Sequence, residues 1–497
     1  MTPPDATAQV MVVGAGPVGL LLAGDLRLHG VRVVLADTLA EPMTESRASQ
    51  LNARTMELLA QRGLVEAFDD LVHEAAGHFG GLAFDARTTA SRYAGNWKVP
   101  QFRTEAVLGE RARAAGVDLR REHRLRTLQV TDDGVEARFD TPAGPRTLRA
   151  DYLVGCDGAG STVRDLAGFE LSGSAAVREL LRADITGIEV PDRRFERFER
   201  GFAASSRRAD GVTRVMVHTS GRPPAPRTGP PSFAEVAEAW RTVTGEDIAG
   251  ATAIWLDAFD DARAQATAYR RGRVLLAGDA AHVHMPVGGQ ALNLGLQDAA
   301  NLGWKLAAQV HGWAPPDLLD SYHEERHPVG RRVLDNVQAQ GMLLFGGAGT
   351  APVRDVLAEL LARPELHELF AGMVSGLDVR YAVGPGDRPL LGARMPDLDL
   401  TVDGTPTTVS HLLGDGTAVL LDLTGDRTSA GDLLRAAHPW TGRVRVIAGT
   451  CDADLTDGAA FLLRPDGHVV WTDRARLPLR QALRRWFGDA EAVAHPA

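Results

Sequence analysis

The apolar positions near the start of the chain follow first the period of a strand and then that of a helix. Residues 9–13 form a short apolar run that is typical of a buried strand and leads directly into a glycine-rich turn. Four leucines between positions 20 and 26 then share one face of a helix that ends near Gly30, and a second strand follows at 31–36. This order predicts a βαβ unit at the beginning of the chain.

Similar patterns predict the elements of the remaining chain. Thr104 and Ser232 are good N-caps, and Glu235 forms a capping box with Ser232. We expect helices at 52–62, 104–116, 232–244, 293–310 and 478–487, and further helices up to about Ser375. We expect strands at 117–121, 125–131, 135–140, 152–155, 211–217, 274–277, 418–423, 444–448, 460–463 and 468–471.

The domain organisation follows from changes in these patterns and from the length of 497 residues, which suits about three domains. The first α/β pattern is interrupted by a mixed module of strands and a helix, and it returns near Arg273. A third unit begins near Pro396. We expect boundaries at 1–175 (with an excursion toward the substrate at 76–102), 176–269, 270–395 and 396–497.

The composition excludes several classes of protein. The chain carries 54 basic and 64 acidic residues, a net charge of −10, and has no basic run that would neutralise nucleic-acid phosphates. Cys156 and Cys451 are too few for a disulfide framework and fit a reducing cytoplasm. No stretch reaches the roughly 18 apolar residues of a membrane span. We therefore expect a cytoplasmic protein that is larger than a lone binding module, and the sequence does not decide its oligomeric state.

The first candidate motif is the turn after the first strand. Gly14, Gly16 and Gly19 have the G-x-G-x-x-G spacing that lets backbone amides approach a pyrophosphate at a helix N-terminus. Asp37 ends the second strand, 18 residues after Gly19, where a carboxylate can bind ribose hydroxyls. Together the strand, helix and acid favour an adenine dinucleotide over an ordinary tight turn.

The second candidate motif begins where a buried strand delivers Asp279 to its carboxyl end. A carboxylate there can hold ribityl hydroxyls, and Gly288 and Gly289 let backbone N–H groups lie against a ring. The helix expected from Asn293 would place positive partial charge beside the anionic edge of a reduced flavin. The alternative is an ordinary connection between a strand and a helix.

A third motif, residues 152–164, contains a strand, the turn Asp157-Gly158 and a helix start with an internal Arg164. The three motifs in this order resemble those of class A flavoprotein monooxygenases, the single-component FAD-dependent aromatic hydroxylases. The stretches 78–82, 99–101 and 302–306 and the C-terminal unit resemble the angucycline-type aromatic polyketide hydroxylases, and rifampicin-type monooxygenases share much of this pattern. The resemblance covers nearly the whole chain.

This resemblance implies an α/β fold with a Rossmann-like FAD-binding domain, an inserted mixed-sheet substrate domain and a thioredoxin-like C-terminal domain. In the C-terminal unit no cysteine directly follows the first strand, 418–423, so a dithiol role is excluded. The resemblance also implies FAD as cofactor and NADPH or NADH as co-substrate. The cofactor-binding residues it implies are Gly14, Gly16, Pro17, Val18, Gly19, Asp37, Arg47, Gln101, Leu125, Asp157, Gly278, Asp279, Pro286, Gly289, Gln290, Ala291, Leu292 and Asn293.

Two positions depart from the family pattern. Asp37 stands where the family usually has Glu, which shortens the reach toward the ribose by one methylene. Ala291 stands where the family usually has Gly, and its methyl group could narrow the range of positions that a flavin adopts. These departures bear on the affinity for FAD and on its movement.

The function implied is hydroxylation of an aromatic, polycyclic polyketide phenol with O2 through a flavin C4a-hydroperoxide. The alternatives are a rifampicin-type enzyme that inactivates an antibiotic and an FAD-binding protein that has lost oxygenation. The cofactor carries this chemistry, so no catalytic side chain is assigned. Candidate pocket residues, each of which also fits a hydrophobic core, are Phe79, Trp97, Met216 and Trp255.

A zinc peptidase is the alternative from another class. Residues 323–327 match H-E-x-x-H, in which two histidines one helical turn apart bind zinc. Pro328 is expected to disfavour helical conformation at His327, and no third ligand has a suitable spacing. His282 and His284 fit structural roles better than metal ligation. We therefore expect no metal site.

Overall fold

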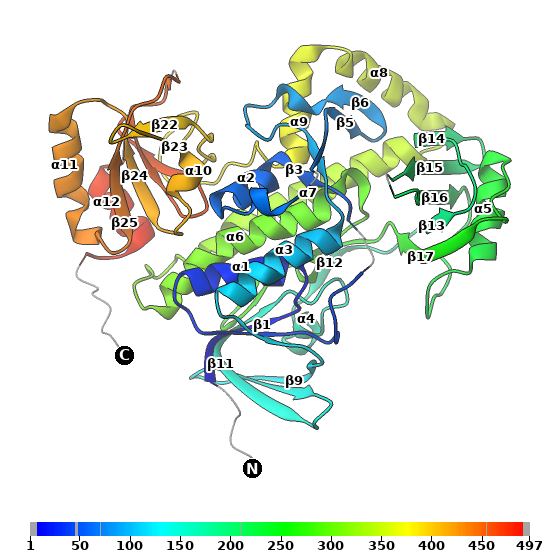
Figure 1. The fold of residues 1–497 in the computed structure, drawn as a ribbon, viewed down its shortest axis with the longest axis horizontal. Coiled ribbons are helices and arrows are strands. Elements are labelled where there is room, and N and C mark those ends of the chain that lie inside the picture. Colours follow the sequence, from blue (N-terminus) through cyan, green and yellow to red (C-terminus); the bar gives the residue numbers. More distant parts are fainter. Residues whose placement is uncertain (1–6, 45–47, 70, 209, 454, 491–497) are drawn as a thin grey trace.

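The computed structural model describes residues 7–44, 48–69, 71–208, 210–453 and 455–490 (Figure 1). Its largest sheet has eight strands and is mainly parallel at its centre. The order along this sheet is β19-β20-β11-β1-β2-β8, and β10 and β9 extend it from β11. These strands are β1 Thr7–Val13, β2 Val33–Ala36, β8 Asp118–Arg120, β9 Arg124–Val130, β10 Val135–Asp140, β11 Arg146–Gly155, β19 Arg270–Arg271 and β20 Val274–Leu276.

The parallel strands are short apolar runs because both of their faces are covered. Val10, Met11 and Val12 are fully buried, as are Leu153 and Val154 of the neighbouring strand. Helices α1 (Pro17–Leu28), α3 (Gln101–Ala114) and α6 (Gln290–Val310) lie together beside this sheet in Figure 1. The N-terminal βαβ unit predicted from the sequence is therefore confirmed.

A second sheet contains five antiparallel strands in the order β14-β15-β16-β13-β17. Helix α5 (Phe233–Thr244) packs on one face of it, and Trp240 of this helix is fully buried. Ser232 caps α5 by accepting a hydrogen bond from the N–H of Glu235, as predicted. The strands are β13 Glu179–Thr186, β14 Arg193–Phe198, β15 Gly201–Arg207, β16 Thr213–Thr219 and β17 Thr252–Asp260.

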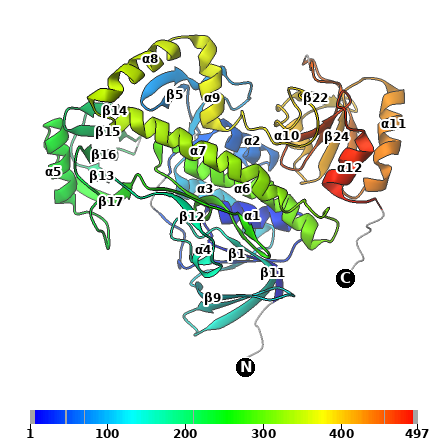
Figure 2. The same ribbon diagram turned by 180° about the vertical axis from the view of Figure 1, so that it is seen from behind.

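Long helices connect the sheets. Helix α7 (Ser321–Phe345) runs along α6 from the C-terminal region to the five-stranded sheet, as Figure 2 shows from behind. Shorter elements complete this part: α2 Ala53–Gln61, α4 Thr162–Leu166, α8 Ala351–Leu361, α9 His367–Ser375, β3 Leu51–Asn52, β4 Val72–Glu74, β5 Ala76–Phe79, β6 Leu82–Asp85, β7 Asn96–Lys98, β12 Leu171–Ser174, β18 Arg263–Ala266 and β21 His282–Val283. No helix among the described residues has the length and apolar character that a membrane crossing needs.

The C-terminal region has its own four-stranded sheet, in the order β25-β24-β26-β27. β24 and β25 are parallel, whereas β26 and β27 form an antiparallel hairpin through Asp466 and Gly467, as predicted. Its elements are α10 Val409–Leu412, α11 Arg427–Ala437, α12 Leu479–Phe487, β22 Asp399–Val402, β23 Thr405–Thr408, β24 Ala418–Asp422, β25 Val444–Ala448, β26 Ala460–Leu463 and β27 Val469–Thr472.

Three sequence expectations about helices were wrong. Helix α3 begins at Gln101 after Pro100, so Thr104 lies buried inside the helix and is not its N-cap. Helix α6 begins at Gln290 rather than near Asn293, because Gly289 in the left-handed conformation turns the chain directly into the helix. Helix α7 continues through Pro328, since packing along its length outweighs the hydrogen bond that proline cannot donate.

A buried cluster of charged side chains joins the C-terminal sheet to α6 and α7. The Glu325 carboxylate accepts hydrogen bonds from Arg464 (2.6 and 2.9 Å), Lys305 (2.8 Å) and Asn301 (2.7 Å). Arg464 also donates to Asp466 at 3.0 Å. All five residues are buried. Their mutual pairing is what makes burial of the charges tolerable.

The charges of this cluster shift the pKa of Glu325. Burial raises the pKa of its carboxyl, but Arg464 and Lys305 outweigh burial and lower the pKa to about 2. A glutamate in an unfolded chain has a pKa of about 4.3. Because the folded pKa is the lower one, Glu325 stabilises the fold above about pH 4.3, and this stabilisation is lost as the pH falls toward 2.

We expect Glu325→Gln to unfold more easily than wild type at neutral pH, by about 3–5 kcal/mol, because Arg464 and Lys305 lose their anion. This difference should shrink as the pH falls from about 5 to about 2. Thermal unfolding followed across this range measures it. Glu238→Gln, in an exposed side chain, is the matched control. A difference between wild type and Glu325→Gln that does not depend on pH would contradict the electrostatic origin of the effect.

Candidate functional site

The three sequence motifs meet at the carboxyl edge of the parallel sheet. At that edge Val13 of β1 is paired with Ala36 of β2 and with Gly155 of β11, and Gly155 is paired with Leu276 of β20. The loops that follow β1, β11 and β20 therefore start side by side, although the first residues of the outer two, Gly14 and Ala277, are 263 positions apart in the chain. Ligands bind at this edge in open α/β sheets.

The glycine-rich turn leaves its backbone open at one position. A Cβ on Gly14, whose φ is +104°, would lie 2.4 Å from the carbonyl oxygen of Cys156, and one on Gly19 would collide with Gly14. A Cβ on Gly16 would meet no described atom within 4 Å. Gly16 is the N-cap of α1, and no side chain caps this helix. In the part of the chain that the structure describes, the start of α1 thus has open space beside Gly16 and no side-chain cap on its N–H groups, which suits a pyrophosphate.

Asp37 closes this turn from the neighbouring strand. Its carboxylate accepts hydrogen bonds from the N–H groups of Ala15 (2.6 Å) and Leu39 (2.7 Å), and Arg121 lies 3.5 Å away. The short aspartate therefore stabilises the glycine-rich turn itself. Its contact with a ribose stays a prediction.

Asp279 follows β20 in a short turn. Its side chain is exposed, and among the described residues its carboxylate has no hydrogen-bond or ion-pair partner. A Cβ on the preceding Gly278 would lie 3.0 Å from Val18 of α1, so the turn packs directly on the first turn of α1. This packing places an unpaired carboxylate beside the glycine-rich turn.

A buried aspartate of α6 holds this turn in place. Asp298 accepts hydrogen bonds from the N–H of Gly278 (3.1 Å) and from Arg326 (2.7 Å), and its oxygen lies 2.6 Å from His282 Nε2. Asp298, Arg326 and His282 are fully buried. Burial raises the pKa of Asp298, but Arg326 and His282 outweigh it and leave the pKa below its usual value. His282 is thus structural, as predicted.

The N-terminus of α6 is a second helix end without a side-chain cap. Asn293 supports it: its side-chain amide donates to the carbonyl of Gly289 (2.7 Å), and its side-chain oxygen accepts from the N–H of Asn52 (2.9 Å). The Asn293 side chain is therefore committed to the protein. The backbone N–H groups at this helix end remain available to a ligand.

The third motif is organised around Asp157. Its carboxylate accepts hydrogen bonds from the Ser161 hydroxyl (2.5 Å) and from the N–H of Val163 (3.0 Å). Burial raises the pKa of Asp157. In the following helix the buried Arg164 donates to the carbonyl of Ala280 at 3.4 Å. Arg164 therefore connects the second and third motifs.

The remaining predicted residues lie around these loops. Gln101 bonds to Glu105 (2.8 Å) and to the N–H of Ala48 (3.3 Å) at the start of α3. Leu125 is buried in the core and pairs with Phe139 in the ladder between β9 and β10. Pro17, Pro286, Ala291 and Leu292 lie at the two helix N-termini and in the loop before α6. Arg47 lies outside the described residues.

The candidate pocket residues do not form one group. Met216 belongs to an apolar cluster with Met285 and Val287 of the loop before α6. Phe79 packs against Phe370, with ring centroids 5.1 Å apart, in a different cluster. Trp97 packs on the core of the large sheet, and Trp255 lies under Arg182, 4.6 Å from the guanidinium carbon. Of these four candidates, Met216 thus packs against the loop before α6, which is the loop predicted to contact the flavin.

The H-E-x-x-H residues do not form a metal centre. His323 accepts a hydrogen bond from the N–H of Tyr269, and its ring lies 4.7 Å from that of His327. Glu324, the glutamate of this motif, is exposed on the surface of α7. No cluster of three or more metal-ligating side chains occurs among the described residues. A zinc peptidase therefore has no support.

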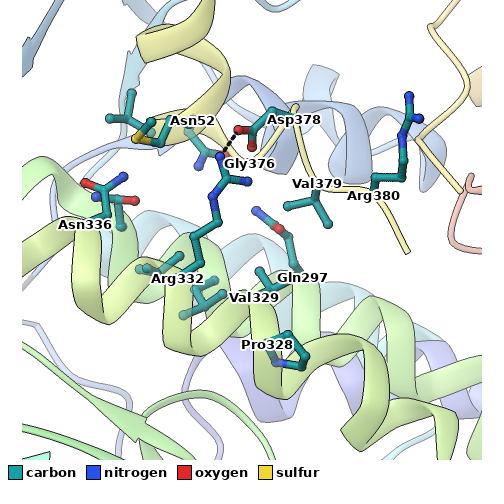
Figure 3. A pocket seen from close by; sticks show the side chains of 15 residues that line it. Asn52, Gln297, Pro328, Val329, Arg332, Asn336, Gly376, Asp378, Val379 and Arg380 are labelled. Atoms are coloured by element: carbon teal, nitrogen blue, oxygen red, sulfur yellow. Dashed lines mark hydrogen bonds and ion pairs between the residues drawn. The ribbon is translucent and has the colours of Figure 1, made fainter. Parts of the chain in front are cut away.

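A cavity of about 180 Å³ lies between α6, α7 and α9 (Figure 3). Arg332 spans it to donate to Asp378 at 2.5 Å. Buried Gln290 also lines it, and its side-chain nitrogen has no partner among the described residues. Pockets for drug-sized ligands measure roughly 300–1,000 Å³. This cavity is therefore too small for a polycyclic substrate.

Asp298, Arg326 and Arg121 were missed by sequence reasoning. Each acts through residues distant in the chain, which a local pattern does not reveal. An acid such as Asp298 within the strongly apolar helix 290–310 was an available signal, because buried carboxylates require partners.

Comparisons with known proteins agree along nearly the whole chain. Residues 7–337 match the FAD binding domain, and residues 388–490 match the C-terminal domain of aromatic-ring hydroxylases. A rifampicin monooxygenase of Streptomyces venezuelae is 42% identical over 97% of this chain and 99% of its own.

Two further similarities involve enzymes of polyketide pathways. The 12-dehydrotetracycline 5-monooxygenase/anhydrotetracycline 6-monooxygenase of Streptomyces rimosus subsp. rimosus is 40% identical over 96% of this chain and 98% of its own. A solved structure of an aromatic hydroxylase from angucycline biosynthesis is 48% identical, with a TM-score of 0.94 over 97% of this chain and 99% of that chain.

We expect Gly16→Val to abolish FAD binding while the protein stays folded. The new side chain would enter the open space at the end of α1 and displace a pyrophosphate, so FAD affinity should fall by about a hundredfold or more. The melting temperature without FAD should change by about 2 °C or less. Titration with FAD and thermal unfolding measure both.

Gly14→Val is the contrasting variant. Its Cβ would meet Cys156 and its φ is positive, so it should lower the melting temperature without FAD. Equal FAD affinity in wild type and Gly16→Val would contradict the placement of the ligand at this turn.

Proposed function

This chain belongs to the family of FAD-binding monooxygenases with an aromatic-ring hydroxylase C-terminal domain, and on that premise we propose that it hydroxylates a polycyclic aromatic phenol of the polyketide type. The reaction uses FAD as cofactor and NAD(P)H and O2 as co-substrates. The reliance on NAD(P)H and the two free cysteines support a cytoplasmic enzyme.

One observation carries the proposal: at one edge of the sheet, two helix N-termini without side-chain caps converge with the Asp279 carboxylate, which has no partner among the described residues. The N–H groups of α1 would bind the FAD pyrophosphate, and Asp279 would bind the ribityl hydroxyls. The N–H groups at the start of α6 would face the pyrimidine edge of the ring. The residues present thus fit FAD.

Bound FAD would supply hydride acceptance from NAD(P)H and activation of O2 for transfer of one oxygen atom to an electron-rich ring. The protein must stabilise negative charge, orient the phenol and exclude water. The N-terminus of α6 would stabilise the charge without an ionisable side chain. The sequence has a single G-x-G-x-x-G motif, so NAD(P)H would approach the same flavin.

The face of the five-stranded sheet opposite α5 would orient the phenol. Phe202 and Met216 on this face pack with Met285 and Val287, which flank Pro286 in the predicted flavin loop, and with Phe345 of α7. The Phe202 and Phe345 rings lie edge to face, 5.2 Å apart. An aromatic and apolar surface beside the flavin suits a planar polycyclic phenol.

Membership in this family also supports the domain boundaries expected from the sequence. In that division residues 176–269 would bind the substrate. We also propose that the C-terminal region is thioredoxin-like, because β24 and β25 are parallel and precede a hairpin and the closing helix α12. Cys451 lies after β25. A redox dithiol is therefore not part of the proposal.

A second candidate function is inactivation of an antibiotic of the rifamycin class. It is favoured by the 42% identity to a rifampicin monooxygenase, which extends over nearly the whole chain. Both functions use the same cofactor chemistry. They differ in the substrate that promotes oxidation of NAD(P)H.

We expect the purified protein to bind FAD, with absorption bands near ~370 and ~450 nm, and to oxidise NAD(P)H faster when its substrate is present. Angucycline-type and tetracycline-type phenols and rifampicin should be compared by NADPH oxidation. The product should gain one oxygen atom, which mass spectrometry after reaction in ¹⁸O2 detects.

The two candidates give different results. Stimulation and oxygen transfer with polycyclic phenols support the proposed function, whereas both effects with rifampicin alone support the second candidate. A flavoprotein that consumes no O2 productively with either class contradicts both. Gly16→Val serves as the control without bound cofactor.

A further inference from the structure

Two adjacent residues of α7 face two different parts of the molecule. Arg326 is directed to Asp298 (2.7 Å) and to the carbonyl of Leu294 (3.1 Å) in α6. Glu325 is directed to Arg464 of the C-terminal sheet. Both α7 side chains are at least nine-tenths buried. The backbone of one helical turn thus connects the C-terminal region to the predicted flavin site.

The path from Arg326 to the flavin site is short. Asp298 accepts hydrogen bonds from Arg326 and from the N–H of Gly278 (3.1 Å), the residue before Asp279. The carbonyl of Leu294, which Arg326 also binds, lies near the start of α6. Arg326 therefore contacts α6 directly and reaches the turn of Asp279 through Asp298.

The C-terminal region contacts this path at two residues, Glu325 and Tyr381. Arg464 forms a two-point ion pair with Glu325, at 2.6 and 2.9 Å, and its guanidinium also lies 5.2 Å from the ring centroid of Tyr381. Tyr381, on the segment between α9 and the C-terminal region, accepts a hydrogen bond from Arg326 through its hydroxyl at 3.1 Å. His468 of the same region packs on the Tyr381 ring, with centroids 4.2 Å apart.

We propose that Arg464 is a positioning residue for the FAD site, and that the C-terminal domain thereby completes a cofactor site to which it contributes no contact. Arg464 fixes Glu325 and Tyr381, these two residues fix Arg326, and Arg326 and Asp298 fix the turn of Asp279 and the start of α6. This inference rests on the proposed function, because it takes FAD to be the ligand at these two segments.

The balance of buried charges explains why loss of Arg464 would move residues beyond its direct contacts. The buried cluster around Glu325 contains the cations Lys305 and Arg464 and the carboxylates of Glu325 and Asp466. Tyr381 links this cluster to the buried ion pair of Arg326 and Asp298. Removing one cation leaves a buried carboxylate short of a partner. The remaining cations must then be shared, which moves side chains along the cluster.

The experiment compares FAD binding by the full-length chain and its variants. Arg464→Met removes the cation, and Arg464→Lys keeps the charge but loses the two-point geometry. Tyr381→Phe removes a single hydroxyl, which makes it a variant that should fold. Each variant is titrated with FAD, and the visible circular dichroism of bound FAD reports on the surroundings of the ring.

Arg394→Met is the matched control. Arg394 is also a buried arginine of the C-terminal region, and it pairs with the buried Glu57 of α2 at 3.1 Å. Among the described residues no hydrogen bond or ion pair joins Glu57 to Asp298 or Glu325. Glu57 also pairs with Arg54, which donates to the main-chain carbonyl of Asp466 and not to its carboxylate. The control therefore loses a comparable ion pair between the two regions while the path to Gly278 stays intact.

We expect FAD affinity to fall by about tenfold or more in Arg464→Met, by less in Arg464→Lys, and by about two- to fivefold in Tyr381→Phe. The circular dichroism of bound FAD should change in all three. Arg394→Met should bind FAD as wild type does, even where its melting temperature falls.

Two results would overturn the inference. The first is a Tyr381→Phe protein with the FAD affinity and circular dichroism of wild type, together with the same FAD affinity in Arg464→Met and Arg394→Met. This result would show that Arg464 has a general structural role. In that case the wild-type protein still binds FAD and the proposed function stands. A wild-type protein that binds no FAD would contradict the proposed function and this inference together.

Discussion

The parallel register of β2, β1, β11 and β20 is the constraint on which the candidate site depends. Because their carboxyl ends are aligned, the loops after β1, β11 and β20 meet, and two helices begin near this edge without side-chain caps. A pyrophosphate and a reduced flavin both carry negative charge. In the proposed site this charge would meet the backbone N–H groups at the two helix N-termini.

The second structural theme is a chain of buried ion pairs behind the site. Asp298 is paired to Arg326 on the side of the flavin loop, and Glu325 is paired to Arg464 on the side of the C-terminal sheet. Such pairs add little stability compared with apolar packing, but they fix geometry because each charge tolerates few arrangements. In the proposed reaction the flavin ring would be oriented toward both NAD(P)H and a phenol, and these ion pairs would hold its surroundings in place.

The sequence predicted the features that are encoded locally. The strand, the glycine-rich turn and α1 are contiguous, so their periodicity and spacing were sufficient, and the hairpin at Asp466-Gly467 follows from turn chemistry. Helix starts were less predictable: Thr104 has the chemistry of an N-cap, but the backbone after Pro100 is already helical. Pro328 was expected to interrupt a helix that tertiary packing maintains.

The supporting residues of the site were beyond local reasoning. Asp298 and Arg326 are 28 residues apart, and Arg464 lies a further 138 residues along the chain. Their pairing is a consequence of how α6, α7 and the C-terminal sheet pack. Resemblance to a family identified the loops that line the site, whereas the structure identified the residues behind those loops.

Hydrogen exchange of the backbone amides, with and without FAD, tests the central claim most directly. The claim is that amides from separate loops converge on one bound cofactor. We predict that FAD slows exchange in the peptides covering 14–20 and 288–294 together, with a smaller effect at 278–281. Unchanged exchange in these peptides, or protection confined to a different part of the chain, would contradict the account.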